Sequence, residues 1–138
     1  MLFCDTGIDA ERLASLKLYQ KVNYFPHSFE ICRKTYLARN LHKFQKLFPV
    51  EYDFTPKTWM LPKSHREVRA EFDKRKSSKE QLILIVKPDC MSQGKGIFLV
   101  NKLTQLKKWA NNSKLPFQQL NLKEAYVISK YINNPLLV

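Results

Sequence analysis

Two of the chain's three glycines flank a lysine in the stretch KPDCMSQGKGIFLV, residues 87–100, between two apolar runs. The eight residues that join these runs exceed the about two to five residues usual in a tight hairpin. Glycine has no Cβ and tolerates positive φ, so Gly94 and Gly96 can bring backbone N–H groups close to a ligand. Lys95 between them and Lys87 before them carry charge suited to phosphate oxygens. The stretch predicts either a phosphate-binding loop or a bulged glycine hairpin without a ligand, and these residues alone leave both open.

The loop does not match two widespread phosphate motifs. A P-loop needs GK[ST] after Gxxxx, and no such string occurs here. The GxGxxG fingerprint opens a helix, whereas residues 97–100 are apolar and predict a strand. The assignment of the loop therefore depends on the rest of the chain.

Disulfide and metal chemistry have little support in the sequence. Cys4, Cys32 and Cys90 are odd in number and show neither CxxC nor histidine spacing. Neither a disulfide framework nor a zinc site is therefore expected, and a reducing compartment fits this pattern. The twelve Asp and Glu residues include no clustered pair with metal-ligand spacing, so no metal ligand is assigned.

The composition indicates a basic globular chain. Its 138 residues, 44% of them hydrophobic, can form the core of one modest domain or parts of two. A net charge of +12 favours a polyanionic partner: nucleic acid, acidic lipid or an acidic protein tail. No apolar run approaches the about 20 residues that span a bilayer, and no signal-peptide pattern opens the chain. We therefore expect a cytosolic protein with no membrane partner.

Apolar periodicity and chain breakers predict the elements that position the loop. Helices are expected at 9–20, at 28–48 with Ser28 as N-cap, within the charged stretch 63–80, and at 102–110. Strands are expected at 82–88, 97–100 and 125–132, while Pro56 and Pro62 restrict 51–62 to a short edge strand or an extended connector. The polar stretch before residue 81 predicts a boundary between an N-terminal portion, 1–80, and a second portion, 81–138.

Four segments carry a resemblance to a known family. They are VNYFPHSFEICRKTYLARNL (22–41), FTPKTWMLP (54–62), KPDCMSQGKGIFL (87–99) and EAYVISKYINNPLLV (124–138). In this order, from about Lys21 to Val138, they resemble the tubulin tyrosine ligase-like family of ATP-grasp enzymes, and within it the tubulin polyglutamylases. The resemblance implies a partial ATP-grasp fold of class α+β (α/β), with a helical N-terminal region, a small antiparallel sheet and a flanking helix.

The resemblance also implies a nucleotide site, with ATP and Mg²⁺ as cofactors. Lys87 corresponds to a family lysine that contacts phosphate, and Lys34 to a second lysine that approaches the nucleotide. From its position alone, Lys34 is also typical of a solvated basic helix face. The other implied positions are a phosphate-covering loop, Gln93, Gly94, Lys95 and Gly96, and a hinge that holds adenine, Lys130, Tyr131 and Ile132. Catalytic residues are not assigned, because the acidic magnesium ligands of the family are expected beyond Val138.

Two positions depart from the family pattern. Residues 89–92 supply no glycine where many relatives have one, and Ser129 stands where glutamine is common. The resemblance then implies a shortened or lost adenine contact at Ser129.

The implied activity is ATP-driven activation of a carboxylate in a tubulin tail as an acylphosphate, followed by attack of an amino acid's amine, with glutamate expected as that amino acid. We expect this chain alone to be inactive and its parent protein to act in the cytoplasm on the cytoskeleton, including the axoneme or basal body of a cilium or flagellum. Acidic tubulin tails would be drawn to the basic surface.

The alternative is a non-catalytic microtubule-associated or ciliary structural protein with a ligase-derived fold. A nucleic-acid module is not favoured, because no RRM, KH or zinc pattern occurs.

Overall fold

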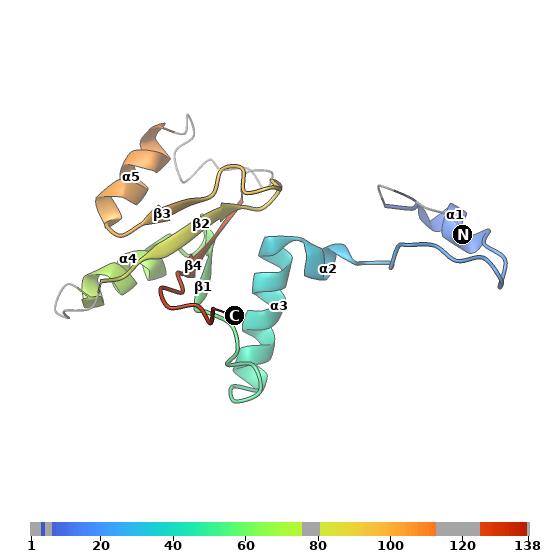
Figure 1. Ribbon diagram of the computed structural model, residues 1–138, viewed down its shortest axis with the longest axis horizontal. Coiled ribbons are helices and arrows are strands. Elements are labelled where there is room, and N and C mark those ends of the chain that lie inside the picture. Colours follow the sequence, from blue (N-terminus) through green and yellow to red (C-terminus); the bar gives the residue numbers. More distant parts are fainter. Residues whose placement is uncertain (1–3, 5–6, 76–80, 113–124, 138) are drawn as a thin grey trace.

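The computed structural model describes residues 4, 7–75, 81–112 and 125–137. Its helices are α1 (Ala10–Ala14), α2 (Phe29–Cys32), α3 (Lys34–Leu47), α4 (His65–Arg75) and α5 (Leu103–Asn112). Its strands are β1 (Thr58–Leu61), β2 (Leu84–Pro88), β3 (Phe98–Val100) and β4 (Tyr126–Lys130). The strands form one antiparallel sheet in the order β1-β4-β2-β3 (Figure 1). The predicted combination of helices with a small antiparallel sheet is confirmed.

Alternation along the strands separates the two faces of the sheet. In β2, Leu84, Val86 and Pro88 are buried, whereas Ile85 and Lys87 are half-buried. This period of two is what a pleated strand imposes on side chains. Of the two possibilities predicted for 51–62, a short edge strand or an extended connector, the structure shows an edge strand, β1, which pairs with β4.

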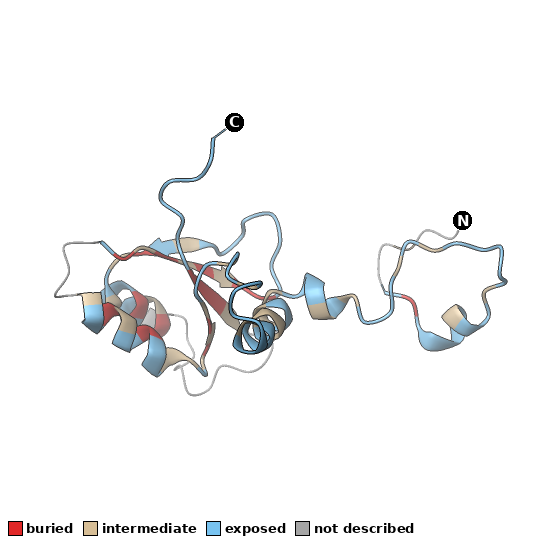
Figure 2. Ribbon diagram, turned by 90° about the horizontal axis from the view of Figure 1, so that it is seen from below, coloured by how far each residue is buried: buried red, intermediate tan, exposed pale blue. Residues whose placement is uncertain are grey.

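The hydrophobic core lies between the sheet and two helices. Val68 and Phe72 from α4 and Leu106 from α5 pack with buried residues of all four strands, and Figure 2 shows buried segments along the sheet and on the facing sides of these helices. Because β1 and α4 precede residue 80 and the other strands follow it, one sheet and one core include residues from both predicted portions. The boundary near residue 80 stays a prediction.

Two helix predictions differ from the structure. The helix predicted over 28–48 is divided into α2 and α3 at Arg33, whose backbone is extended (φ −80°, ψ 128°). Ser28 makes no side-chain cap hydrogen bond because its backbone is already helical (φ −54°, ψ −23°), whereas an N-cap needs an extended conformation. The helix predicted over 9–20 is confined to α1, because Leu18 and Tyr19 are exposed and no packing stabilises further turns.

The segment containing α1 lies apart from the sheet, at the far end of the molecule in both ribbon views (Figures 1 and 2). Asp9 caps α1 by accepting a 2.7 Å hydrogen bond from the Arg12 N–H. None of the helices within the described ranges is long and apolar enough to cross a membrane.

Candidate functional site

The connection between β2 and β3 is a glycine loop with left-handed backbone at three positions. Gln93, Gly94 and Gly96 have φ of 56°, 75° and 71°. The Lys95 N–H donates to the Ser92 carbonyl at 3.1 Å, and the Ile97 N–H donates to the Gly94 carbonyl at 3.3 Å. Residues 90–97 are all exposed. The loop is therefore a pair of tight turns presented to solvent at the end of the sheet.

Lys87 lies in β2 just before this loop. It is paired with Val127 in β4, and the alternation of β2 places its side chain on the face opposite the core residues Val86 and Pro88. The residue is half-buried, and within the described ranges its side-chain ammonium has neither a hydrogen-bond nor an ion-pair partner. Its ammonium is therefore available to a ligand anion.

Lys34, the first residue of α3, reaches the base of the same loop. Its Nζ donates to the carbonyl of Met91 at 2.8 Å and to the carbonyl of Asp89 at 3.3 Å. Two segments separated by more than 50 residues thus meet here. The structure places Lys34 against the start of the loop that links Lys87 to Gln93, Gly94, Lys95 and Gly96.

Two further residues at this junction were missed in the sequence. Asp89 is buried, with 8% of its surface exposed, and its Oδ1 accepts a 2.8 Å hydrogen bond from the Thr35 N–H. Arg33 Nη1 lies 2.7 Å from Cys90 Sγ and 3.8 Å from Asp89 Oδ2. In the sequence, Arg33 directly precedes Lys34, and Asp89 follows Lys87 by two residues. This closeness to two predicted site residues was the signal from which both could have been found.

The predicted hinge begins at Lys130, the last residue of β4, and continues through Tyr131 and Ile132 at the opposite end of β2. The Tyr131 N–H donates to the Ile83 carbonyl and the Lys130 N–H to the Lys57 carbonyl, both at 2.9 Å. The Ile132 N–H has no such partner in the described part of the chain. Of the three N–H groups, only that of Ile132 is therefore available to a base.

The two groups of predicted residues are separated along the sheet. Ile83, beside the hinge, precedes Lys87 by four residues, or about 13 Å at 3.3 Å per residue. Lys130 pairs with Leu84, so its side chain points to the face opposite that of Lys87. A ligand on the face of the sheet that carries Lys87 can place an anionic end at the loop and at Lys87, and a base at the hinge backbone. It cannot also contact the Lys130 ammonium, which lies on the other face.

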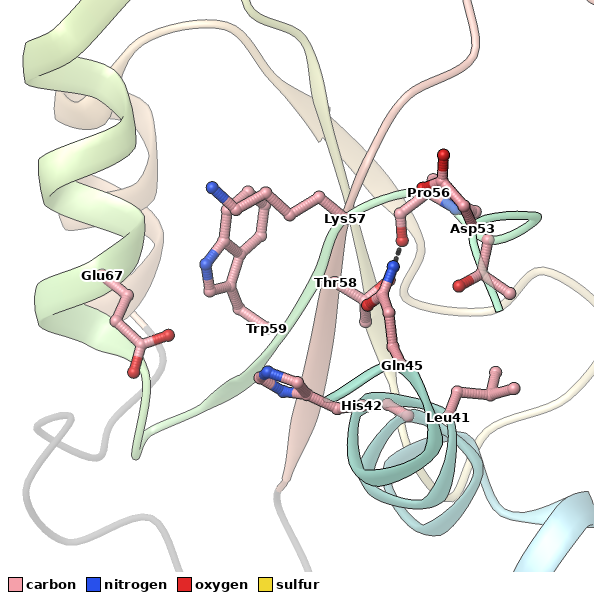
Figure 3. Close-up of a pocket in the computed structure, with 11 residues that line it drawn as sticks. Leu41, His42, Gln45, Asp53, Pro56, Lys57, Thr58, Trp59 and Glu67 are labelled. Atoms are coloured by element: carbon pink, nitrogen blue, oxygen red, sulfur yellow. Dashed lines mark hydrogen bonds between the residues drawn. The ribbon is translucent and has the colours of Figure 1, made fainter. Parts of the chain in front are cut away.

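A separate cavity of about 460 Å³ lies between α3, β1 and the start of α4 (Figure 3). His42, Trp59 and Glu67 line it, and the predicted site residues are not among its lining residues. Lys57, also in its wall, lies 5.2 Å from the Trp59 ring centroid and donates to Glu71 Oε2 at 2.7 Å. This hydrogen bond holds the pKa of the Glu71 carboxyl below its ordinary value of 4.5. The Lys57 ammonium is thus already neutralised by protein groups.

Metal ligation is not evident in these residues. Within the described ranges, no group of three or more His, Cys, Asp or Glu side chains is placed to hold a metal ion. The arrangement at the glycine loop is instead cationic, with backbone turns and the lysines Lys34, Lys87 and Lys95, which suits phosphate oxygens.

The sequence matches the model of the tubulin-tyrosine ligase family over residues 11–138. It is 38% identical over 138 residues to a probable beta-tubulin polyglutamylase of Tetrahymena thermophila, 33% over 138 residues to tubulin polyglutamylase TTLL7 of Homo sapiens, and 36% over 134 residues to tubulin polyglutamylase TTLL13 of Mus musculus. These matches cover 100%, 100% and 97% of this chain. The chain spans only 10%, 14% and 14% of the lengths of these relatives.

A solved structure supports the fold independently. The C-terminal domain of Pby1 from K. lactis, an ATP-grasp enzyme that interacts with the mRNA decapping enzyme Dcp2, superposes with a TM-score of 0.52 at 22% identity. The match covers 94% of this chain and 36% of that one. The predicted partial ATP-grasp-like fold is thereby confirmed.

Proposed function

Because the chain belongs to the tubulin-tyrosine ligase family, we propose that it is the nucleotide-binding portion of an ATP-dependent ligase that adds glutamate to tubulin tails. The observation that carries the proposal is the meeting of Lys34 from α3 with the glycine loop after Lys87. Lysines from two distant segments converge on a loop whose turns expose backbone N–H groups. Such a site has the positive charge and backbone donors that phosphates require.

The described residues fit the phosphate end of ATP. Lys87 supplies an ammonium that has no partner among the residues that the structure describes, and Lys95 lies in the loop between the two glycines. Space is open around Gly94, since a Cβ there would meet no atom within 4 Å. The Lys34 ammonium can replace its hydrogen bonds to the Asp89 and Met91 carbonyls with hydrogen bonds to phosphate oxygens, because both kinds of oxygen are acceptors.

The hinge fits the base end of the same nucleotide. The Ile132 N–H is available as a donor, and the exposed side chains of Tyr131 and Ile132 offer apolar surface next to it. Such a slot, mostly apolar with few polar contacts, is typical of a nucleotide pocket. The role of Lys130 in this proposal is confined to its backbone.

ATP would supply the phosphoryl group that activates the acceptor carboxylate of the tubulin tail before the amine of glutamate attacks. The residues of this chain bind and orient the phosphates. No described cluster fits magnesium, so metal ligation is not assigned to this chain. The parent protein is proposed to act on microtubules in the cytoplasm, including those of cilia.

The decisive experiment measures ATP-dependent incorporation of labelled glutamate into tubulin by the full-length protein. Lys87→Ala is expected to lower kcat/KM for ATP at least about tenfold, since it removes a charged contact to phosphate. Lys107→Ala, in an exposed position of α5, serves as the matched control and should retain wild-type activity. Glutamate incorporation without ATP, or full activity of Lys87→Ala, would refute the proposal.

A further inference from the structure

Asp89 joins three segments of the chain at the candidate site. Its N–H donates to the Ala125 carbonyl at 2.9 Å, next to the start of β4. Its own carbonyl accepts from Lys34 Nζ at 3.3 Å, and its Oδ1 accepts from the Thr35 N–H at 2.8 Å. Asp89 itself follows the last residue of β2. One buried residue therefore ties together β2, β4 and the N-terminus of α3.

The contact with Thr35 replaces a missing helix cap. Arg33 occupies the N-cap position of α3 and makes no side-chain cap hydrogen bond, because a guanidinium has no acceptor. The carboxylate of Asp89 accepts from an N–H of the first turn instead, and a negative charge is favourable at a helix N-terminus. The cap is thus supplied by the loop that the helix contacts.

Lys34 lies directly between Arg33 and Thr35, so its backbone position depends on this cap. The Arg33 guanidinium, 3.8 Å from Asp89 Oδ2, holds the same carboxylate from the other side. Without the carboxylate, the first turn of α3 loses its backbone hydrogen bond to the loop, while the side-chain contacts of Arg33 with Cys90 and of Lys34 with Met91 remain. The backbone that carries Lys34 would then be fixed less firmly, and its ammonium would be held less well beside the loop.

We infer that Asp89 is a positioning residue for nucleotide binding, acting through Lys34. It sets the N-terminus of α3 against the glycine loop so that the Lys34 ammonium lies where the phosphates bind. This inference rests on the proposed function, since it names a further residue of the same site.

The test uses the full-length protein with Asp89→Ala, Asp89→Glu and Asp89→Asn, and measures kcat, the KM for ATP and the Kd of a non-hydrolysable ATP analogue. Asp89→Ala should raise the KM for ATP and the analogue Kd about tenfold, as expected for loss of a buried charge-assisted hydrogen bond. Asp89→Asn retains an Oδ1 acceptor and should restore both values to within about threefold of wild type. Asp73→Ala removes a carboxylate from α4 and serves as the control.

Coupling to Lys34 separates positioning from a general effect on folding. If Asp89 acts through Lys34, adding Asp89→Ala to Lys34→Ala should raise the analogue Kd no further. A purely structural role would lower the active fraction, and hence kcat, with the KM for ATP unchanged, and would overturn the inference. Additive effects on the Kd would also overturn it.

Asp89→Glu covers the case in which Asp89→Ala does not fold. It keeps the charge but shifts the carboxylate by one methylene, and should raise the KM for ATP about threefold. A wild-type KM for this variant would overturn the inference. If wild-type protein bound no ATP analogue, the proposed function would itself fail, whereas normal wild-type binding with unaffected Asp89 variants would refute only the positioning role.

Discussion

The two loop glycines meet different requirements although both have positive φ. At Gly94, with φ of 75°, a Cβ would meet nothing within 4 Å. At Gly96, with φ of 71°, a Cβ would lie 3.1 Å from Pro88 Cγ and 3.3 Å from Met91 Sδ. Gly94 is therefore required only for its backbone conformation, whereas Gly96 also allows the loop to fold back against the end of β2.

Alanine at these two positions should destabilise the protein to different extents. Gly94→Ala is expected to lower the free energy of unfolding by about 1 kcal/mol, the cost of left-handed backbone for a residue with a Cβ. Gly96→Ala should cost about 1–3 kcal/mol more, because Pro88 and Met91 must move. Urea unfolding of the two variants checks this order, and equal losses would contradict the close approach at Gly96.

The sequence allowed the loop and its two lysines to be predicted, because glycine, lysine and their order are local signals. It did not reveal Asp89 as a cap. A cap normally precedes its helix directly, whereas Asp89 lies 54 residues beyond the N–H that it accepts from. The role of such a residue depends on tertiary contacts and not on spacing.

Among the elements, β1 and α4 are linked by an ion pair at the edge of the sheet. Lys57, which precedes β1, donates to Glu71 of α4 at 2.7 Å, and the Glu71 side chain is 14% exposed. Because the pKa of Glu71 is lowered by this hydrogen bond, the unfolded chain binds the proton more tightly than the folded one. The contribution to stability is therefore complete above pH 4.5 and is lost as the pH falls through the folded-state pKa.

Glu71→Gln should lower the free energy of unfolding by about 1 kcal/mol at neutral pH. The difference from wild type should shrink as the pH falls below 4.5, where the unfolded wild-type chain begins to bind the proton, and should vanish below the lowered folded-state pKa of Glu71. Urea unfolding across the acid range measures this convergence. Glu67→Gln, exposed on the same helix, is the control; a pH-independent difference for Glu71→Gln would contradict the linkage.

The helix α5 is held to the sheet through a buried leucine. Leu106 is 0% exposed and belongs to the core, and Trp109 of the same helix lies 5.2 Å from the Phe98 ring centroid. Leu106→Ala should therefore cost about 2–5 kcal/mol. Chemical denaturation tests this, with exposed Lys108→Ala as a control for helix propensity; a loss below about 1 kcal/mol would show that α5 contributes little to the core.

Element predictions succeeded where packing and periodicity agree. The strands β2, β3 and β4 and the helix α5 lie within two residues of their expected bounds, since alternating or helical apolar spacing is satisfied by burial. The break at Arg33 was not predicted, because the apolar spacing of the sequence continues through it. In the structure, the extended backbone of Arg33 begins a new helix whose first turn is bound by the Asp89 carboxylate. Tertiary structure there overrides a continuous local pattern.

For the whole molecule, the excess of positive charge should act mainly on encounter with acidic partners. Lys43 and Lys46 are exposed on α3 and, within the described ranges, have no ion-pair partner. Replacing both with Glu in the full-length protein should weaken microtubule cosedimentation and reduce its salt dependence, because screening acts on exposed charges over about 10 Å at 0.1 M salt. Proteolytic removal of tubulin tails should remove the difference between variant and wild type. A difference that persists without tails would contradict this account.

The order β1-β4-β2-β3 has a consequence for synthesis of the protein on the ribosome. The strand that lies between β1 and β2 is β4, which is the last of the four to be translated. Until residues 126–130 emerge, β1 has no partner strand, and one edge of β2 lacks the backbone hydrogen bonds that it makes in the finished sheet. The nascent chain can form the β2–β3 hairpin before residues 126–130 emerge, but the four-stranded sheet closes only after these residues have left the exit tunnel.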